Sequence, residues 1–193
     1  MSDSEHYAGQ LEELGYHNTE DLDTAAVILI NTCCVRETAE DKTLGKIGEL
    51  KHLKKQNPDL IIAVTGCMAQ EWQDKLFKRA PHIDLVIGTH NIHKLIELIR
   101  ERRSKADHYM AADMTLPAFH DMPVKRFQKF FAWIPIMNGC NKFCTYCIVP
   151  YVRGREVSRP IDAIVEEIKK VAAEGYKEIT LLGQNVNSYG LDL

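Results

Sequence analysis

Three cysteines near the C-terminal end have the residue type and spacing of a metal site. Cys140, Cys144 and Cys147 stand in the spacing C-x-x-x-C-x-x-C, on a loop opened by Asn138 and Gly139. Cysteine thiolates are the ligands of iron–sulfur clusters, and three of them can hold three corners of a four-iron cluster. The fourth iron then keeps an open position, and open positions are where metal sites do chemistry. The spacing therefore predicts a [4Fe-4S] cluster with one open iron.

Zinc is the main alternative for this loop. A structural zinc site needs four ligands, usually from two pairs of cysteines or from histidines. No cysteine follows Cys147 and no histidine follows His120, so a fourth ligand would have to come from the N-terminal half. Disulfides are disfavoured, because three close cysteines cannot all pair and the first residues are polar, unlike a secretory signal.

The composition indicates a globular protein of one or two domains. Of 193 residues, 45% are hydrophobic and 26% are charged, and the formal net charge is −3. This charge gives the chain as a whole no electrostatic case for nucleic-acid binding. No apolar run approaches the roughly 20 residues that span a bilayer, so we expect no membrane association. Six cysteines without a secretory signal favour metal or redox chemistry in the cytoplasm.

The N-terminal half alternates between predicted strands and helices. Strands are predicted where apolar residues run continuously, which is typical of strands buried on both faces. Helices connect them, and strands separated by helices pair in parallel, so we expect an α/β fold with a doubly wound sheet. The strands are expected at residues 25–30, 60–64 and 84–87, and the helices at 3–14, 35–56, 71–79 and 92–102.

Cysteines follow two of these predicted strands. Cys33 and Cys34 come directly after the first strand, Cys67 after the second, and His90 occupies the same position after the third. Ligands of such sheets gather beyond the carboxyl ends of the strands, so Cys33 and Cys67 are candidates for part of a second metal site. A cysteine is equally often a small buried apolar residue, and the spacing alone leaves both interpretations open.

The C-terminal part resembles the opening of a parallel (β/α) barrel. A strand over residues 130–137 leads into the cysteine loop, and Pro135 predicts an edge or irregular position within it. A helix follows from Pro160, and a strand over 177–182 ends beside Gln184 and Asn185. We therefore expect one domain over 1–103, a linker over 104–128 that has Pro117 and Pro123 and room for a short strand, and a second domain over 129–193.

Several segments together carry a family resemblance over essentially the whole chain. In their order and separation they resemble the methylthiotransferase family of radical S-adenosylmethionine (SAM) enzymes. Residues 181–190 are similar to the branch of that family that modifies isopentenylated adenosine in tRNA. Relatives that act on threonylcarbamoyl-adenosine in tRNA, or on an aspartate of a ribosomal protein, usually differ there. The segments are Asn31-Thr32-Cys33, Thr65-Gly66-Cys67-Met68-Ala69-Gln70, residues 139–147, residues 148–156 and Ser158-Arg159.

The resemblance implies two [4Fe-4S] clusters. Cys140, Cys144 and Cys147 would hold the cluster that reduces SAM, and Cys33 and Cys67 would supply two of the three ligands of an auxiliary cluster that provides sulfur. A second SAM would supply the methyl group. The product implied is a methylthio group at C2 of N6-isopentenyladenosine next to the anticodon. The partners would be that tRNA and an electron donor protein. Cys34 is expected to be a bystander, because neighbouring side chains rarely face the same way.

Other residues are candidates for contact with the cofactor or with RNA. By resemblance, Tyr146, Gln184 and Asn185 are expected near the cofactor, although Gln184 and Asn185 would also suit the cap of a strand end. Arginines and aromatics beside the cysteines suit phosphate contact and base stacking. Tyr151, Arg153 and Arg155 are therefore candidates for RNA binding, against the alternative of a solvated loop.

The chain departs from the family at both ends. Family members carry a strand and the third auxiliary cysteine upstream of the segment that matches Ser2, and here both are absent. Beyond Leu193, the rest of the barrel and a C-terminal RNA-binding domain are absent as well. The expectation is therefore an incomplete N-terminal domain joined to a truncated radical SAM domain. An inactive metal-binding fragment is the remaining hypothesis.

Overall fold

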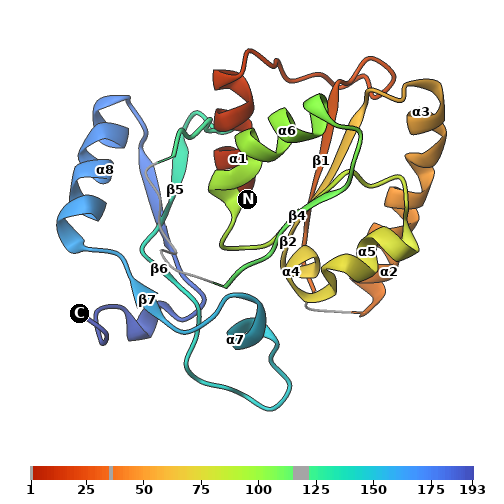
Figure 1. The fold of residues 1–193 in the computed structure, drawn as a ribbon. Helices are drawn as coiled ribbons and strands as arrows, with labels where there is room; N and C mark the ends of the chain where they lie inside the picture. The colour runs from red at the N-terminus through yellow and green to blue at the C-terminus, as the bar shows by residue number, and fades with distance from the viewer. Residues whose placement is uncertain (1, 35–36, 115–121) are drawn as a thin grey trace.

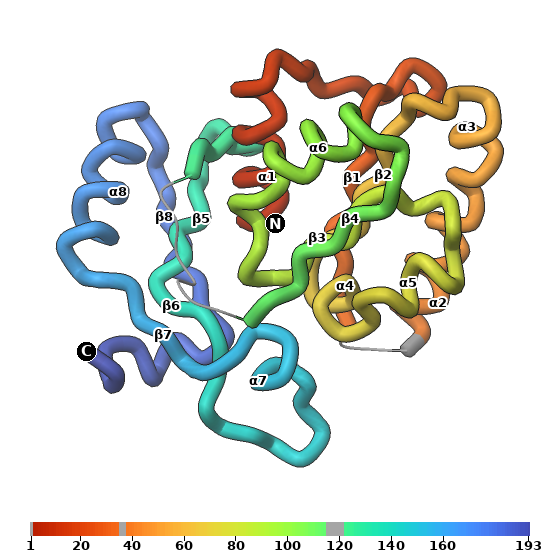
Figure 2. Tube along the Cα trace, viewed as in Figure 1, coloured from red at the N-terminus to blue at the C-terminus, as the bar shows by residue number. Residues whose placement is uncertain are grey.

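The computed structural model describes residues 2–34, 37–114 and 122–193, and it arranges them as two units side by side (Figure 1). The first unit is built on a four-stranded parallel sheet in the order β1-β2-β3-β4, which is also the order of the chain (Figure 2). This confirms the predicted parallel α/β sheet. Its strands are β1 (Val27–Thr32), β2 (Ile61–Gly66), β3 (Leu85–Ile87) and β4 (Tyr109–Ala111).

Helices cover both faces of this sheet, which explains why its strands are apolar without alternation. Ile62 and Val64 of β2 pack with one group of helices, while Ile61 and Ala63 pack with the other. The helices of the second group are α1 (Ser2–Glu13) and α6 (Leu95–Ser104). The helices of the first group are α2 (Glu37–Glu49), α3 (Lys51–Gln56), α4 (Cys67–Trp72) and α5 (Asp74–Arg79).

Three of the predicted helices are not single unbroken helices. The helix expected over 35–56 is divided at Leu50 into α2 and α3, and its first residues, Val35 and Arg36, lie outside the described residues. The helix expected over 71–79 starts earlier, at Cys67, and is divided at Gln73, whose φ of 47° is left-handed and cannot continue a helix. The third begins as the short 3₁₀ helix η1 (Ile92–Lys94) before α6.

Much of the predicted linker is attached to the first unit. β4 pairs with β3 at the edge of the sheet, so the short strand expected in this stretch is present. Farther on, the Lys125 N–H donates to the carbonyl of Glu5 at 3.0 Å, and the Phe127 N–H donates to the Glu5 carboxylate at 3.0 Å. Pro117 lies outside the described residues. The domain boundaries at 103 and 129 stay a prediction, but the described parts of the stretch between them form hydrogen bonds with the first unit.

The second unit repeats the strand, helix, parallel strand pattern of a (β/α) barrel. β5 (Phe131–Pro135) and β8 (Glu178–Leu182) pair in parallel, and α8 (Ile161–Ala173) crosses between them. The strand expected over 130–137 is interrupted at Ile136, next to Pro135. The smaller elements are β6 (Met137–Asn138), α7 (Val149–Val152), β7 (Val157–Ser158) and η2 (Val186–Ser188).

Only part of the apolar stripe of α8 is covered. Ile164 and Val171 are buried against β5, whereas Ile161 is 63% exposed and Val165 40% exposed. The sheet below the helix has two strands, and this is too narrow to cover the whole stripe.

The two units contact each other through α1 and through α7, among other places. α1 touches β5, and α7 packs on α4, where Val152 joins the core of the first unit. The second contact is the one that concerns function, because α7 follows directly after the cysteine loop. Within the described residues, no helix is both long and apolar enough to cross a membrane.

Candidate functional site

The loop that carries Cys140, Cys144 and Cys147 is closed at its base by backbone contacts. Gly139 has a φ of +80°, and a Cβ atom there would lie 2.0 Å from the carbonyl oxygen of Arg155, so the position requires glycine. The next residue, Cys140, donates its N–H to the Gly154 carbonyl at 3.1 Å. Both ends of the loop therefore meet, and the cysteines are presented between them.

Two predicted cofactor residues brace this base. The Gly139 N–H donates to the side-chain oxygen of Gln184 at 2.7 Å. Asn185 donates to the Glu156 carboxylate at 3.0 Å, on the other side of the loop base. The end of β8 therefore lies beside the cysteine loop, as the barrel interpretation expects. Whether Gln184 or Asn185 also contacts a cofactor stays a prediction.

The three thiols of the loop suit iron chemically. All of them are free; Cys144 is exposed, while Cys140 and Cys147 are half-buried. A turn joins the last two, with the Cys147 N–H donating to the Cys144 carbonyl at 2.9 Å. Across the ranges that the structure describes, no three His, Cys, Asp or Glu side chains stand close enough together to hold a metal ion. The three free thiols are the right kind of donor for an iron–sulfur cluster. Their assignment as its ligands stays a prediction.

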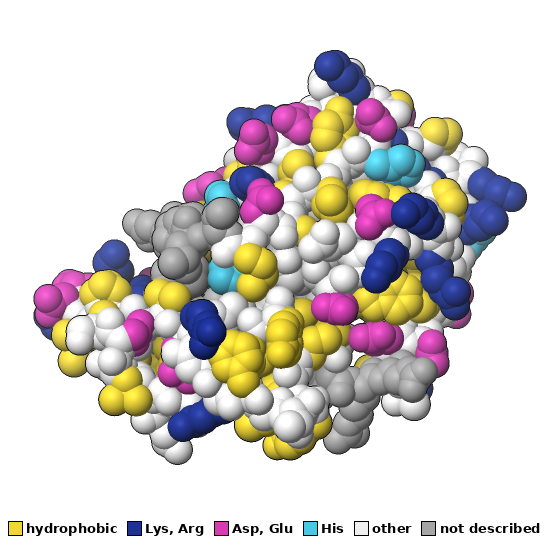
Figure 3. Space-filling view, turned by 60° about the horizontal axis from the view of Figure 1, so that its bottom comes forward, with side chains coloured by type: hydrophobic (Ala, Val, Ile, Leu, Met, Phe, Trp, Pro, Cys, Tyr) yellow, Lys and Arg dark blue, Asp and Glu magenta, His cyan; other side chains and the backbone are white. Residues whose placement is uncertain are grey.

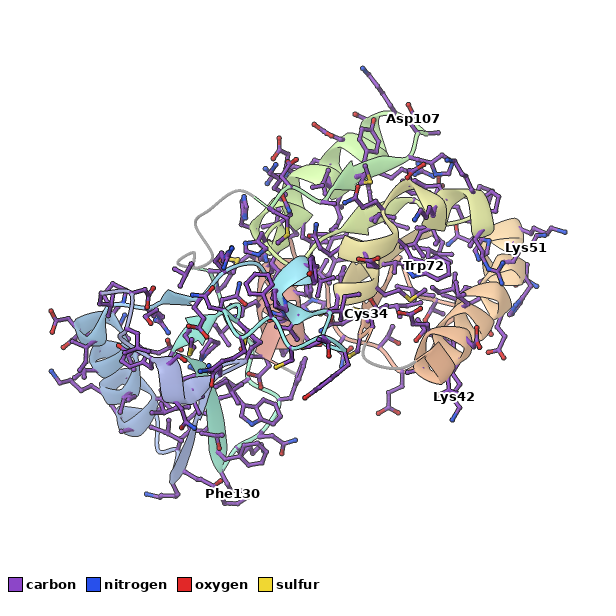
Figure 4. All side chains as sticks on the ribbon, turned by 90° about the horizontal axis from the view of Figure 1, so that it is seen from below. Cys34, Lys42, Lys51, Trp72, Asp107 and Phe130 are labelled. Atoms are coloured by element: carbon purple, nitrogen blue, oxygen red, sulfur yellow. The ribbon has the colours of Figure 1, made fainter. Side chains whose placement is uncertain are left out.

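The other cysteines lie at the carboxyl ends of β1 and β2. Thr32 pairs with Gly66 as the last residues of the two strands, so the chain continues into Cys33 and Cys67 at equivalent positions. Cys33 is exposed, whereas Cys34 is buried and packs in the same core cluster as Cys67. Seen from below, Cys34 lies centrally, between α7 and α2 (Figure 4). The two neighbours do face different ways, as expected, but the one assigned as a bystander is the one that contacts Cys67.

This contact changes the charge of Cys67. The Cys34 thiol donates a hydrogen bond to the Cys67 sulfur, and this bond, together with the nearby Arg153 guanidinium, outweighs burial and lowers the pKa of Cys67 to about 6. The pKa of Cys34 is raised, because it acts as the donor and is buried. Thiolates are the nucleophiles and metal ligands among sulfur groups, so Cys67 is ready for either role at neutral pH.

Arg153 lies between the units rather than on the open surface. Its guanidinium donates to the Asp3 carboxylate at 2.7 Å and also bonds the Cys67 sulfur. Burial opposes its charge, but Asp3 and Cys67 outweigh burial and raise its pKa. Sequence reasoning missed this arrangement, and no local signal could have revealed it, since Asp3 and Arg153 are 150 positions apart.

Aromatic side chains surround the cysteine loop on its solvent side. Tyr146 is 90% exposed and Tyr151 is 67% exposed, and Phe143 packs edge-on against Tyr151 with ring centroids 6.0 Å apart. The Arg155 guanidinium stands 4.3 Å from the centre of the Phe143 ring. Figure 3 brings this lower face of the molecule forward and shows hydrophobic and basic side chains next to one another on it. Exposed rings with a nearby guanidinium are able to stack on planar groups.

A cleft of about 870 Å³ opens between the units. Asp3, Asn138, Arg153 and Gln184 line it on the side of the cysteine sites. Glu167 also lines the cleft, and its carboxylate pairs with two arginines, Arg126 at 3.1 Å and Arg159 at 2.6 Å. The cleft is large enough for a nucleoside-sized molecule and has polar groups to orient it.

Two family models match the chain, one on each unit. The uncharacterized protein family UPF0004 matches residues 1–88, which include Cys33, Cys34 and Cys67. The Radical SAM superfamily matches residues 134–191, which include the cysteine loop and the end of β8.

Curated relatives match over the whole chain. The tRNA-2-methylthio-N(6)-dimethylallyladenosine synthase of Dictyoglomus thermophilum is 50% identical over 193 residues, covering 100% of this chain and 44% of the relative. The synthase of the same name from Staphylococcus aureus strain JH9 is 52% identical over 194 residues, covering 99% of this chain and 38% of the relative. The chain thus spans less than half the length of these relatives.

Proposed function

We propose that the chain belongs to the methylthiotransferase family of radical SAM enzymes and that the protein modifies tRNA by adding a methylthio group at C2 of N6-isopentenyladenosine. The observation that carries the proposal is the closed loop with three free thiols, inside the segment that matches the Radical SAM superfamily. The names of the relatives support the tRNA substrate.

We assign SAM and an iron–sulfur cluster to this loop. Cys140, Cys144 and Cys147 would hold the cluster, and Gly139 and Gln184 keep the loop base closed around it. When bound, the cluster would supply the electron that cleaves SAM. An auxiliary [4Fe-4S] cluster at Cys33 and Cys67 is the finer part of the proposal. The Cys67 thiolate, paired with Arg153, supports it.

The cleft between the units is our proposed place for the cofactor and the target adenine. Asn138 and Gln184 line it next to the loop, and Tyr146 and Asn185 are assigned to cofactor contact by resemblance. Tyr151 and Arg155 are exposed beside the loop and suit stacking and phosphate contact with RNA. Arg153 was predicted with them, and its RNA role stays a prediction. An electron donor protein completes the proposed set of partners.

The first test is SAM cleavage by the chain itself. The chain is reconstituted anaerobically with iron and sulfide, then given SAM and dithionite, and release of 5′-deoxyadenosine is measured. We expect release from the native chain and none from a variant with Cys140, Cys144 and Cys147 replaced by alanine. Bound zinc, or release that survives in the triple variant, would contradict the assignment.

The second test concerns the substrate. The protein at the full length of its relatives is incubated with three substrates: tRNA bearing isopentenyladenosine, tRNA bearing threonylcarbamoyl-adenosine, and the ribosomal protein with its target aspartate. We expect a methylthio product from the first alone, detected by mass spectrometry of the digested nucleosides. A product from either of the others would move the protein to another branch of the family, and SAM cleavage without any product would leave only the cluster assignment standing.

A further inference from the structure

Arg153 makes contacts with three separate parts of the first unit. Its side chain bonds Asp3 on α1, at 2.7 Å, and Cys67 at the start of α4. Its carbonyl accepts a hydrogen bond from Nε2 of His90, at 3.0 Å, in the turn after β3. The guanidinium and the backbone of one residue therefore hold α7 against the carboxyl end of the sheet.

Neighbouring contacts strengthen this attachment. The Thr89 hydroxyl donates to the carbonyl of Val152, the residue just before Arg153. Because a carbonyl only accepts, His90 must carry its proton on Nε2 to make its bond, and its Nδ1 has no hydrogen-bond partner among the residues that the structure describes. Burial lowers the pKa of His90, which keeps the ring neutral and in this arrangement.

The residues that follow Arg153 contact the base of the cysteine loop directly. The next residue, Gly154, accepts the N–H of Cys140, and the carbonyl of Arg155 lies against Gly139. A shift of Arg153 therefore moves the base of the loop. Two bonds lead from Cys67 to Cys140 by this route, one at the Arg153 side chain and one at the Gly154 carbonyl.

We propose that Arg153 is a positioning residue that fastens the base of the cysteine loop to the first unit and so sets the separation between the Cys67 site and the loop site. The inference deepens the proposed function and rests on it for its purpose, because chemistry at two centres must reach one adenine carbon. Geometry of reacting groups contributes strongly to rate, and small displacements cost large factors.

This role competes with RNA contact by the same side chain. The side chain of Arg153 is 19% exposed, and its partner Asp3 is also largely covered. A phosphate would therefore have to reach a guanidinium that is largely covered and already paired with a carboxylate. Arg155 lies two positions away, is exposed, and contacts Phe143 within the loop. The two arginines therefore form a matched pair, one turned toward the first unit and one toward solvent.

The test is hydrogen–deuterium exchange of the metal-free chain, read by mass spectrometry of peptides. We expect Arg153→Met to speed exchange at least about tenfold in two distant peptides, residues 2–13 and residues 138–147, because hydrogen bonds to charged groups are worth about 1.5–3 kcal/mol. Asp3→Asn should speed exchange in the same two peptides. Arg155→Met, the matched control, should leave residues 2–13 as they are in the native chain.

A conservative variant separates positioning from general destabilisation. Arg153→Lys keeps a charge for Asp3 but lacks the planar fork that bonds Asp3 and Cys67 together, so it should restore only part of the protection. The proposal is overturned if Arg153→Met changes exchange only around residue 153, if Asp3→Asn leaves residues 138–147 unaltered, or if Arg155→Met gives the same pattern. No cluster is needed, so failure here is distinct from failure of SAM cleavage.

RNA affinity provides the complementary measurement on the protein at the full length of its relatives. Arg155→Met should weaken binding of the tRNA, whereas Arg153→Met should weaken it by no more than about twofold, since the Arg153 side chain faces Asp3. If both variants weaken tRNA affinity equally, Arg153 contacts the RNA and the positioning role is overturned.

Discussion

The two groups of cysteines sit in different surroundings. Cys67 and Cys34 pack in the core cluster below the sheet, and their sulfur atoms share a hydrogen bond next to a guanidinium. Cys144 is exposed to solvent, and its loop is held at the base by backbone bonds and by the glycine at 139. The first group is distinguished by charge, since the hydrogen bond from Cys34 and the nearby guanidinium lower the pKa of Cys67. The second is distinguished by backbone shape, since the closed base presents its three thiols on one loop.

This difference shows how one chain can prepare thiols in two ways. The lowered pKa of a buried thiol requires a hydrogen-bond donor or a positive charge beside it, so it depends on the packing of several elements. The backbone shape of the loop needs a closed base, and here it depends on the turn at Gly139 and on the hydrogen bonds that Gln184 and Gly154 accept there. The two sites should therefore respond differently to substitution, and the following changes test this difference in order of expected effect.

The largest effect is expected from Cys144→Ser. This change removes one proposed cluster ligand from the loop, so SAM cleavage should fall by more than about 100-fold, because loss of an outer-shell partner alone costs about 10–100-fold and a direct ligand matters more. Unfolding by urea should be unchanged, because Cys144 is exposed and outside every core cluster. Thr145→Ala, also exposed, serves as the control and should retain cleavage. A marked loss of stability in the serine variant would mean that Cys144 shapes the fold.

The next effect concerns the backbone of the loop. Gly139→Ala places a methyl group 2.0 Å from a carbonyl oxygen at a φ of +80°, so we expect a loss of about 3 kcal/mol in the free energy of unfolding. Gly175→Ala is the matched control: its φ is +95°, but its Cβ would meet nothing within 4 Å, so its cost should be about 1–2 kcal/mol. Urea titration measures both. Equal losses would mean that the loop base opens freely.

A smaller change is expected at the charged site. Alkylation of Cys67 in the metal-free chain should rise as pH increases through about 6 and then level off. Cys34→Ala removes the donor that stabilises the thiolate, so the rise should move to higher pH, toward the ordinary thiol value of 9.0.

Peptide mass spectrometry after brief iodoacetamide treatment gives both alkylation profiles. Cys147→Ala is the control and should leave the Cys67 profile in place. An unmoved profile in the Cys34 variant would assign the lowered pKa to Arg153 instead.

The smallest effect is expected at the brace of the loop. Gln184→Ala removes the acceptor of the Gly139 N–H, and we expect a cost of about 1 kcal/mol in unfolding free energy. Asn187→Ala, at an exposed position nearby, should cost less than about 0.5 kcal/mol. If the two costs are equal, water replaces the hydrogen bond to Gln184 without loss of stability. The loop base is then held closed by its backbone contacts alone.

The main elements of the fold were predictable because buried strands require apolar residues, which can be recognised in the sequence. Both faces of β2 are covered, and this produces the continuous apolar run at residues 60–64. The breaks at Leu50 and Gln73 were not predicted. Leu50 is an ordinary helix former, and Gln73 carries no signal for a left-handed conformation, so tertiary packing decides both.

The site divides in the same way. The cysteine loop was predictable, since its spacing, its glycine and its strand lie within one short segment. The contact of Cys34 with Cys67 was not, because it depends on how the chain turns after β1. The link from Asp3 to Arg153 joins residues 150 positions apart, which no local pattern relates.

That last link also has a consequence for biosynthesis. Asp3 and Cys67 precede Arg153 by 150 and 86 positions, so both leave the ribosome before it at a translation rate of about 5–20 residues per second. For a time on the order of ten seconds, the nascent sheet edge holds Cys34 and Cys67 without their guanidinium. Iron delivered to the proposed Cys33 and Cys67 site during that interval would reach the cysteines before Arg153 is in place. The separation of Cys67 and Arg153 along the chain therefore decides whether iron delivered during translation meets the cysteines with or without the guanidinium.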